Sequence, residues 1–213
     1  MRAILLGATG ASGGVLLREL LDDASFTSVS AYTRRPLEIK HEKLQNHVID
    51  FDRILELELL GADVLFSTLG TTIKDAGSKQ AQYKVDVTYQ LEFAKKAHEA
   101  GIQTLVLLSS AGADEKSCAF YTRIKGELEE AVKDLGFKSV SIFRPSILLR
   151  AHRLRLGEKI SLSVLNFFNK FGLFKRFAPQ DLTNLAKAMI KASKSGKTGA
   201  HLYKLDEIDA ILD

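Results

Sequence analysis

Short apolar runs alternate with segments of helical spacing along most of this chain. The apolar runs predict strands at residues 2–6, 28–33, 46–50, 63–67, 104–109 and 139–144, and the helical spacing predicts helices near residues 13–22, 78–99 and 119–135. Within the first helical segment, apolar residues recur every three or four positions, as one buried face requires. Strands that alternate with helices are typical of an α/β domain built on a doubly wound parallel sheet.

The size and composition of the chain fit one domain of this kind. We expect a single domain over its 213 residues, with a core at 1–149 and a small carboxyl-terminal substrate or lid region at 150–213. No apolar run is long enough for a membrane span, and no targeting sequence precedes the first strand. Cys118 is the single cysteine, which excludes an internal disulfide and leads us to expect a reducing, cytoplasmic location. Cysteine and histidine spacing indicates no zinc site.

A glycine-rich turn joins the first strand to the first helix. Gly7, Gly10 and Gly13 form a G-x-x-G-x-x-G pattern there. Glycines at this spacing permit a tight reversal, a close approach of the backbone to a pyrophosphate, and close packing of the helix on the strand. The start of the helix adds free N–H groups and a partial positive charge. The pattern therefore predicts a dinucleotide site, with an ordinary glycine-rich turn as the alternative.

Two arginines follow the second strand, where dinucleotide-binding units often carry an acid. An acidic residue at this place binds the free ribose 2′-hydroxyl of NAD, whereas arginine accommodates the 2′-phosphate of NADP. Arg34 and Arg35 supply guanidinium groups that match the geometry of phosphate. The pair predicts a preference for NADPH, with a solvated basic turn as the alternative.

Two further strand ends are expected beside the same ligand. Asp50 closes the predicted third strand and is a candidate for the adenine end, with simple turn chemistry as the alternative. Leu69 and Gly70 follow the fourth strand and would run beside the cofactor. Asp86 is another candidate for a buried polar residue, but we expect it on the solvated face of a helix. Since ligands of such sheets bind beyond the carboxyl ends of the strands, the strand-end signals converge on one crevice.

A tyrosine and a lysine lie four residues apart on the predicted helix at 119–135. Tyr121 and Lys125 share a face of this helix, because positions i and i+4 are about one turn apart. Ser109 and Ser110 close the fifth strand and bring a hydroxyl to the same crevice. A phenol, an ammonium and a hydroxyl at one place predict a proton-transfer site. Ser109 has the preferred spacing, and Ser110 remains the other candidate.

Taken together, these patterns resemble the short-chain dehydrogenase/reductases, specifically their atypical branch with compact chains. The chain is more closely similar to the Tat-interacting-protein-type oxidoreductases and their bacterial relatives, over most of residues 1–160. The likeness rests on the glycine loop, the Tyr121-x-x-x-Lys125 pair, and the segments Leu69-Gly-Thr-Thr72, Leu107-Leu-Ser-Ser-Ala-Gly-Ala-Asp114 and Phe143-Arg-Pro-Ser-Ile-Leu148.

The resemblance implies a Rossmann-type fold that binds NADPH and reduces a small carbonyl substrate by hydride transfer. In that scheme Tyr121 protonates the developing alkoxide, Ser109 orients the oxygen, and Lys125 holds the ribose. The resemblance also implies cofactor contacts from Thr9, Gly10, Ala11, Ser12, Arg34, Arg35, Leu69, Gly70, Tyr121, Lys125, Leu148 and Arg155. It does not identify the substrate.

The carboxyl-terminal part of the chain is basic and rich in phenylalanine. Residues 150–197 contain eleven lysines and arginines against two acids. The lysines at 187–197 fit a solvated helix face, and because no nucleic-acid-binding module is recognisable, we expect no nucleic-acid partner. The five phenylalanines at 167–177 fit core packing, with a substrate lid, a homo-oligomer contact or a weak peripheral contact with a membrane as alternatives.

Two classes of function remain. The set of Ser109, Tyr121 and Lys125 favours an NADPH-dependent oxidoreductase, because a cofactor sensor needs no proton donor. The alternative is an NADPH-binding regulatory or redox-sensing protein that acts through a protein partner with little turnover, because Tyr121 and Lys125 also serve cofactor binding.

Overall fold

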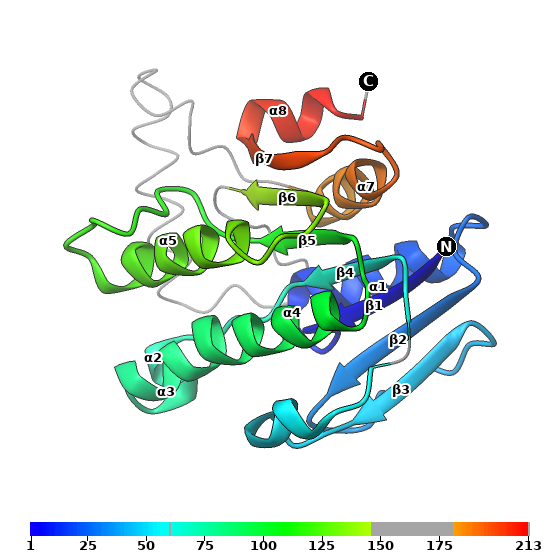
Figure 1. The fold of residues 1–213 in the computed structure, drawn as a ribbon, viewed down its shortest axis with the longest axis horizontal. Coiled ribbons are helices and arrows are strands. Elements are labelled where there is room, and N and C mark those ends of the chain that lie inside the picture. The colour runs from blue at the N-terminus through cyan, green and yellow to red at the C-terminus, as the bar shows by residue number, and fades with distance from the viewer. Residues whose placement is uncertain (60, 146–180, 213) are drawn as a thin grey trace.

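The computed structural model describes residues 1–59, 61–145 and 181–212, which build one parallel β-sheet with helices on both faces (Figure 1). The described strands are β1 Arg2–Leu6, β2 Ser28–Thr33, β3 Leu44–Val48, β4 Val64–Ser67, β5 Thr104–Leu108, β6 Ser139–Arg144 and β7 Gly199–Lys204. Their order is β3-β2-β1-β4-β5-β6-β7, and every neighbouring pair is parallel. The prediction of a doubly wound α/β fold is confirmed.

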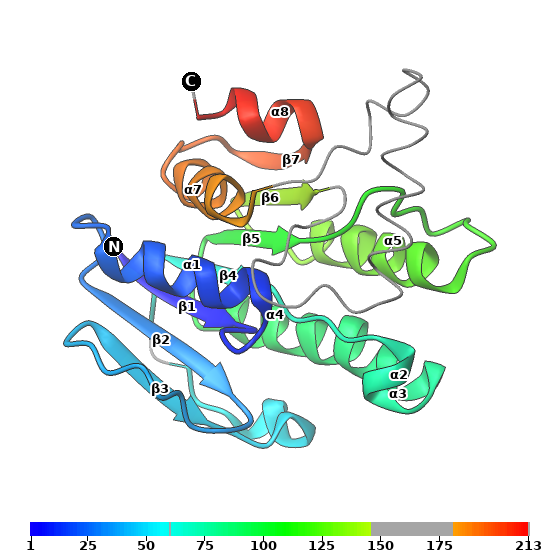
Figure 2. The same ribbon diagram turned by 180° about the vertical axis from the view of Figure 1, so that it is seen from behind.

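Two helical layers cover the sheet, as Figures 1 and 2 show from opposite sides. One layer contains α1 Ala11–Asp22 and α7 Leu182–Ser193, with α8 Leu205–Ala210 packed at the β7 edge. The other layer contains α4 Tyr89–Glu99 and α5 Phe120–Lys133. The shorter helical segments are the 3-10 helix η1 Phe51–Glu56, α2 Ile73–Ala76, α3 Lys79–Tyr83 and the π-helix η2 Lys84–Thr88.

Successive residues of the central strands pack into opposite layers of the core. Leu5 and Phe66 belong to the cluster beneath α1 and α7, whereas Ile4 and Leu65 belong to the cluster beneath α4 and α5. All four side chains are fully buried. A strand that is buried on both faces has no polar side, which explains the unbroken apolar runs at residues 3–6 of β1 and 64–66 of β4.

Two elements differ from their predicted boundaries. β3 lies two residues earlier than predicted, because its pairing with β2 sets Leu44 opposite Val29 and Val48 opposite Thr33. β3 is an edge strand without a fully buried residue, so its apolar pattern specifies its register only weakly. The predicted helix at 78–99 is instead the succession of α3, η2 and α4.

The carboxyl-terminal part contributes to the core as well. α7, where a helix with a lysine face was expected, packs on α1, and β7, which was not predicted, pairs with β6. Residues 182–204 therefore belong to the sheet and its helical layer rather than to a lid. The lysines at 187, 191, 194 and 197 are exposed, as expected. No helix in the described ranges is long and apolar enough to cross a membrane.

Several predicted features lie outside the described residues. These are Leu148, Arg155 and the phenylalanine-rich segment 167–177. The expectations attached to them therefore stay predictions.

Candidate functional site

The glycine loop between β1 and α1 has the close contacts that its spacing predicted. Gly7 has a φ of +86°, and a Cβ there would lie 2.6 Å from the carbonyl carbon of Thr68. A Cβ on Gly13 would lie 2.1 Å from the carbonyl oxygen of Gly7. The Thr68 hydroxyl, which borders both glycines, donates to the Leu6 carbonyl at 2.7 Å. Gly7 and Gly13 thus let the start of α1 approach the ends of β1 and β4.

The amino terminus of α1 suits a phosphate group. Gly10 is the N-cap residue, no side chain caps the helix, and its first turn contains no acid. The N–H groups at the start of a helix lack partners within the helix, so those of Ala11 and Ser12 are oriented to receive an anionic oxygen. Both residues line a cleft. The loop therefore fits the pyrophosphate of a dinucleotide.

Two adjoining cavities cross the carboxyl ends of the strands. The smaller measures about 240 Å³ and the larger about 660 Å³. Both are lined by Gly10, Thr68, Leu69, Gly70 and Thr71. The smaller also contacts Gly7, Thr9, Tyr32, Thr33, Arg34, Phe51, Val85 and Tyr89. The larger also contacts Ala11, Ser12, Thr72, Ile73, Lys74, Asp75, Gln82, Asp86, Leu108, Ser109, Tyr121 and Lys125. Together they form an extended cleft in which an elongated ligand would pass the glycine loop.

The smaller cavity contains one of the two predicted arginines. Both arginines are exposed, but Arg34 lines the cavity and Arg35 does not. The Arg35 carbonyl accepts the Thr33 hydroxyl at 2.7 Å. Asp50 is not among the lining residues; its carboxylate accepts the N–H of Asp52 and caps η1. A role in a turn was the alternative to a contact with the adenine end of the cofactor. Asp50 has this role because β3 ends earlier than predicted. Phe51, the next residue, lines the cavity instead.

Three aromatic side chains also line the smaller cavity. Tyr32, Phe51 and Tyr89 line it, and the rings of Phe51 and Tyr89 lie 5.5 Å apart. Burial raises the pKa of the Tyr32 phenol, so this ring stays uncharged. Tyr89 donates to the carboxylate of Asp52, which ties η1 to α4. The cavity can therefore accommodate a flat, apolar ring system beside the cation of Arg34.

The larger cavity contains the predicted tyrosine and lysine of α5. Tyr121 is 43% exposed and Lys125 is only 3% exposed. The Lys125 Nζ lies 6.0 Å from the centroid of the Tyr121 ring, as positions one helical turn apart allow. The phenol therefore faces the cleft, while the ammonium lies beneath it.

A buried carboxylate balances this ammonium. The Nζ of Lys125 lies 2.9 Å from Oδ1 of Asp86, and both side chains are almost fully buried. The N–H of Thr71 donates to Oδ2 of Asp86 at 2.9 Å. The expectation that Asp86 lies on a solvated helix face is therefore wrong. Asp86 instead continues the buried stripe of this helical run, four residues after Gln82 and four before Gln90, which are both buried.

Buried polar side chains also hold the π-helical turn η2 in place. Gln90 donates to the Asp86 carbonyl at 2.7 Å and to the Leu69 carbonyl at 3.2 Å. Its own carbonyl accepts the Ser67 hydroxyl at 2.7 Å. The end of β4, the turn η2 and Lys125 are thus connected through hydrogen bonds. A π-helical turn of this kind is frequent at functional sites.

Of the two serines, Ser109 is the one that lines the cleft. Ser109 is buried, and its hydroxyl donates to Oε1 of Glu129. Ser110 is half-buried, and its hydroxyl donates to the Ala111 carbonyl at 3.4 Å. The geometry thus favours Ser109 over Ser110.

Glu129 in turn pairs with an arginine at the end of β6. The Nε and Nη2 atoms of Arg144 donate to Glu129, with distances from 2.6 to 3.0 Å. The hydrogen bond to Glu129 raises the pKa of the Arg144 guanidinium above its ordinary value. The sequence held a signal for Glu129, because it continues the spacing of Tyr121 and Lys125 by one more helical turn.

Gly126 positions the loop that carries Ser109. A Cβ at Gly126 would lie 2.1 Å from the backbone nitrogen of Glu115 and 2.3 Å from the carbonyl carbon of Asp114. The N–H of Asp114 also donates to the Thr122 carbonyl at 3.0 Å. The loop after β5 therefore lies directly on α5, which sets the distance between Ser109 and the catalytic candidates on that helix.

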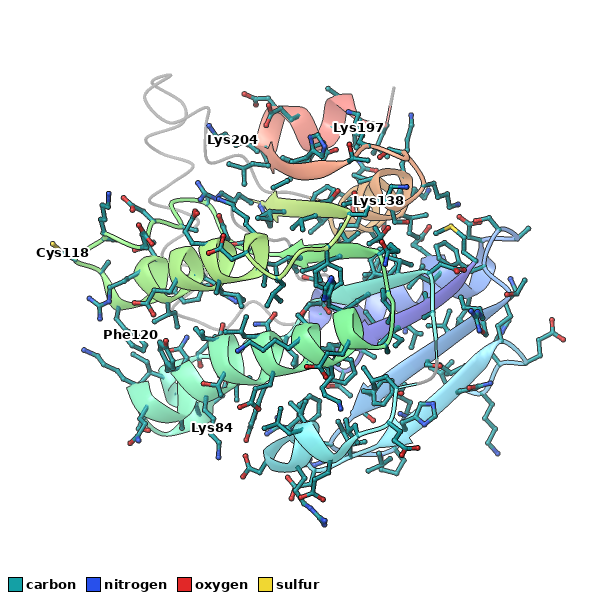
Figure 3. All side chains as sticks on the ribbon, viewed as in Figure 1. Lys84, Cys118, Phe120, Lys138, Lys197 and Lys204 are labelled. Carbon is teal, nitrogen blue, oxygen red and sulfur yellow. The ribbon has the colours of Figure 1, made fainter. Side chains whose placement is uncertain are left out.

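Cys118 is not among the residues that line the two cavities. Figure 3 shows Cys118 at the outer end of the loop before α5, next to Phe120 at the start of that helix, and its side chain is exposed. Among the described residues, no group of three or more histidines, cysteines or acids could hold a metal ion.

Known proteins resemble this chain in sequence. A family described as NAD(P)H-binding matches residues 7–150. Protein HTATIP2 from Rattus norvegicus is 40% identical over 150 residues, which are 68% of this chain but only 62% of the rat protein. The proteins named FMP52, mitochondrial, from Debaryomyces hansenii and Saccharomyces cerevisiae are 38% and 33% identical over 207 and 208 residues. Each alignment covers 95% of this chain and 87% of the relative.

Solved structures share the fold at low sequence identity. The structure described as MoeE5 in complex with UDP-glucose and NAD has a TM-score of 0.71 at 15% identity, covering 98% of this chain and 79% of that one. A UDP-galactose 4-epimerase has the same TM-score at 14% identity, covering 95% and 76%. Likeness at this level of identity extends to the fold alone.

Proposed function

Because the chain belongs to the NAD(P)H-binding family that includes protein HTATIP2 and the FMP52 proteins, we propose that it is an NADPH-dependent oxidoreductase that reduces a small carbonyl compound. One observation carries the proposal: the phenol of Tyr121 and the buried ammonium of Lys125 line the same cleft as the uncapped start of α1. A protein that only senses a dinucleotide needs the second feature but not the first.

The residues of the chain would divide the work as follows. When bound, NADPH supplies the hydride for the carbonyl carbon. Tyr121 gives its proton to the carbonyl oxygen as that oxygen becomes an alkoxide. Lys125, held by Asp86, places a fixed positive charge beneath the phenol and within reach of a ribose. Ser109 contacts the reacting oxygen from the β5 side, and Arg34 binds the 2′-phosphate.

Replacing Tyr121 with phenylalanine tests the catalytic proposal. We expect the variant to lose turnover by at least about a hundredfold, because general acid catalysis commonly contributes that much. NADPH binding should stay largely intact, since the phenol hydroxyl is all that is removed. The measurement is NADPH absorbance over a broad panel of aldehydes and ketones. Tyr83→Phe is the matched control, because Tyr83 is a partly exposed tyrosine outside the lining of both cavities.

Full activity of Tyr121→Phe would reject Tyr121 as the proton donor. If the wild-type protein binds NADPH but shows no Tyr121-dependent turnover on any compound, the alternative gains weight. The protein would then be a regulatory or redox-sensing one in which cofactor occupancy changes contacts with a partner.

Replacing Arg34 with alanine tests the cofactor preference. A charge-assisted hydrogen bond is worth about 1.5–3 kcal/mol, so we expect NADPH affinity to fall by about ten- to a hundredfold. NADH affinity should hardly change, because NADH has no 2′-phosphate. Titrations with both cofactors measure this, with Arg35→Ala as the control, since Arg35 is exposed and does not line the cavity. Tighter binding of NADH than NADPH by the wild-type protein would contradict the assignment.

The cellular location and the partners also remain proposals. We propose a reducing compartment, which fits an exposed, single cysteine, and the cytoplasm is our first expectation. The FMP52 relatives carry the word mitochondrial in their names. Microscopy of a tagged full-length chain should therefore use markers for both the cytoplasm and the mitochondria. We propose a small-molecule substrate as the partner of the cleft and expect no nucleic acid.

A further inference from the structure

Three side chains on one stripe of α5 become progressively more buried. Tyr121, Lys125 and Glu129 follow one another at four-residue intervals, and their exposed fractions are 43%, 3% and 0%. The first side chain faces the cleft, and the second pairs with Asp86. The third is a buried carboxylate to which the proposed reaction assigns no role.

The hydrogen bonds of Glu129 determine where the Ser109 proton lies. Oε1 of Glu129 is close to the Ser109 hydroxyl and also accepts from Nε of Arg144, at 2.9 Å. Oε2 accepts from Nη2 of Arg144 at 2.6 Å. A guanidinium has no lone pair to offer, so all its contacts with Glu129 require the carboxylate to accept. A carboxylate that is ionised by this pairing has no proton to give, so the serine must be the donor.

A serine hydroxyl has one proton and two lone pairs. The proton of Ser109 is committed to Glu129, and the residue lines the cleft with Tyr121 and Lys125. Its backbone is fixed too, because the Ser109 N–H donates to the Phe143 carbonyl at 2.8 Å. The hydroxyl thus presents lone pairs, rather than a proton, to a molecule in the cleft.

We propose that Glu129 is a positioning residue that makes Ser109 a hydrogen-bond acceptor. Ser109 then favours binding of the alcohol product over binding of the carbonyl substrate. The inference rests on the proposed oxidoreductase function for its meaning. Tyr121 is then the donor to the carbonyl oxygen, and Ser109 accepts the hydroxyl of the alcohol that results. A carbonyl oxygen has no proton to give, so the oxygen that Ser109 contacts makes a hydrogen bond with it only after Tyr121 has protonated that oxygen.

Two small ligands that do not react can test whether Ser109 accepts or donates a hydrogen bond in the cleft. Trifluoroethanol is an alcohol that donates a strong hydrogen bond, and isobutyramide offers a carbonyl that is not reduced. Calorimetric titration gives the affinity of trifluoroethanol for the protein saturated with NADP⁺ and of isobutyramide for the protein saturated with NADPH. We expect Glu129→Gln to weaken trifluoroethanol binding about tenfold, as the loss of one hydrogen bond predicts.

The same variant should not weaken isobutyramide binding. A glutamine can give its carbonyl to Arg144 and its NH₂ to Ser109, which would turn the serine proton toward the cleft. The ratio of the two affinities therefore separates a reversed hydrogen bond of Ser109 from a general distortion of the site, which would weaken the binding of both ligands alike. Glu130→Gln is the matched control, because it makes the same change at the neighbouring residue, which forms a partly exposed ion pair with Lys133. Its two affinities should equal those of the wild-type protein.

Ser109→Ala keeps the test decisive if Glu129→Gln does not fold, because it leaves the pair of Glu129 and Arg144 in place. This variant should lose trifluoroethanol affinity and retain isobutyramide affinity. Equal losses for both ligands, no loss for either, or a wild-type protein that binds no trifluoroethanol would each overturn the inference. Because neither ligand turns over, these outcomes are independent of the carbonyl panel that tests the proposed function.

Discussion

Replacing Asp86 with alanine should lower the free energy of unfolding by about 3–5 kcal/mol, because it leaves the ammonium of Lys125 buried without a counter-charge. The ion pair is 2.9 Å long and both side chains are almost fully buried, so water cannot take over the role of the carboxylate. The same change removes the acceptor of the Thr71 N–H. Urea unfolding followed by circular dichroism measures the effect.

The matched control for this variant is Glu130→Ala. Glu130 lies on α5 and forms a largely exposed ion pair with Lys133, and such pairs contribute about 1 kcal/mol or less. Asp86→Leu combined with Lys125→Met should recover much of the lost stability, since removing both charges removes the uncompensated one. A single Asp86→Ala variant that unfolds at the wild-type urea concentration would contradict the buried pair.

Replacing Gly126 with alanine is the second change with a large expected effect. The added Cβ would lie 2.1 Å from the nitrogen of Glu115, and neither the loop backbone nor α5 can yield cheaply. Overpacking of this kind costs about 1–3 kcal/mol and occasionally more, and contacts with backbone atoms favour the upper end. We also expect weaker NADPH-dependent turnover, because the loop that carries Ser109 must move away from Tyr121 and Lys125.

Gly14→Ala provides the control for the second change. Gly14 also lies within a helix, and a Cβ there would be 3.4 Å from its nearest neighbour, the Ala8 carbonyl oxygen. Alanine is the better helix former by about 1 kcal/mol, so this variant should be as stable as the wild-type protein or slightly more so. If Gly126→Ala unfolded at the same urea concentration as Gly14→Ala, the close contact between the loop and α5 would be disproved.

Local signals in the sequence predicted much of the cofactor side of the cleft. The tasks of Gly7 and Gly13 follow from their spacing alone, because a turn between a strand and a helix depends on neighbouring residues. Arg34 lines the cavity because it follows the end of β2 directly. Asp50 shows the limit of this reasoning: a shift of β3 by two residues made it the cap of η1.

The buried charges of the site were much harder to predict. Asp86 and Glu129 both occur in helical segments where an acid usually faces water, so pattern alone placed Asp86 in solvent. Asp86 is buried because Lys125, on another helix, and the N–H of Thr71 meet it there. Glu129 is buried because Arg144, fifteen residues later and on a strand, meets it there. Such contacts join segments from different elements, which come close together only when the sheet has assembled.

By itself, the sequence determined the α/β class, the glycine loop, the basic turn at Arg34 and the helical stripe of Tyr121 and Lys125, because each depends on residues within a few turns of one another. Only the tertiary structure decided that Asp86 neutralises Lys125, that Ser109 rather than Ser110 lines the cleft, and that Glu129 accepts a hydrogen bond from the serine hydroxyl. The physical reason is that a charged or hydroxyl side chain takes its role from the partners around it when water is excluded, and those partners come together only when the strands and helices pack.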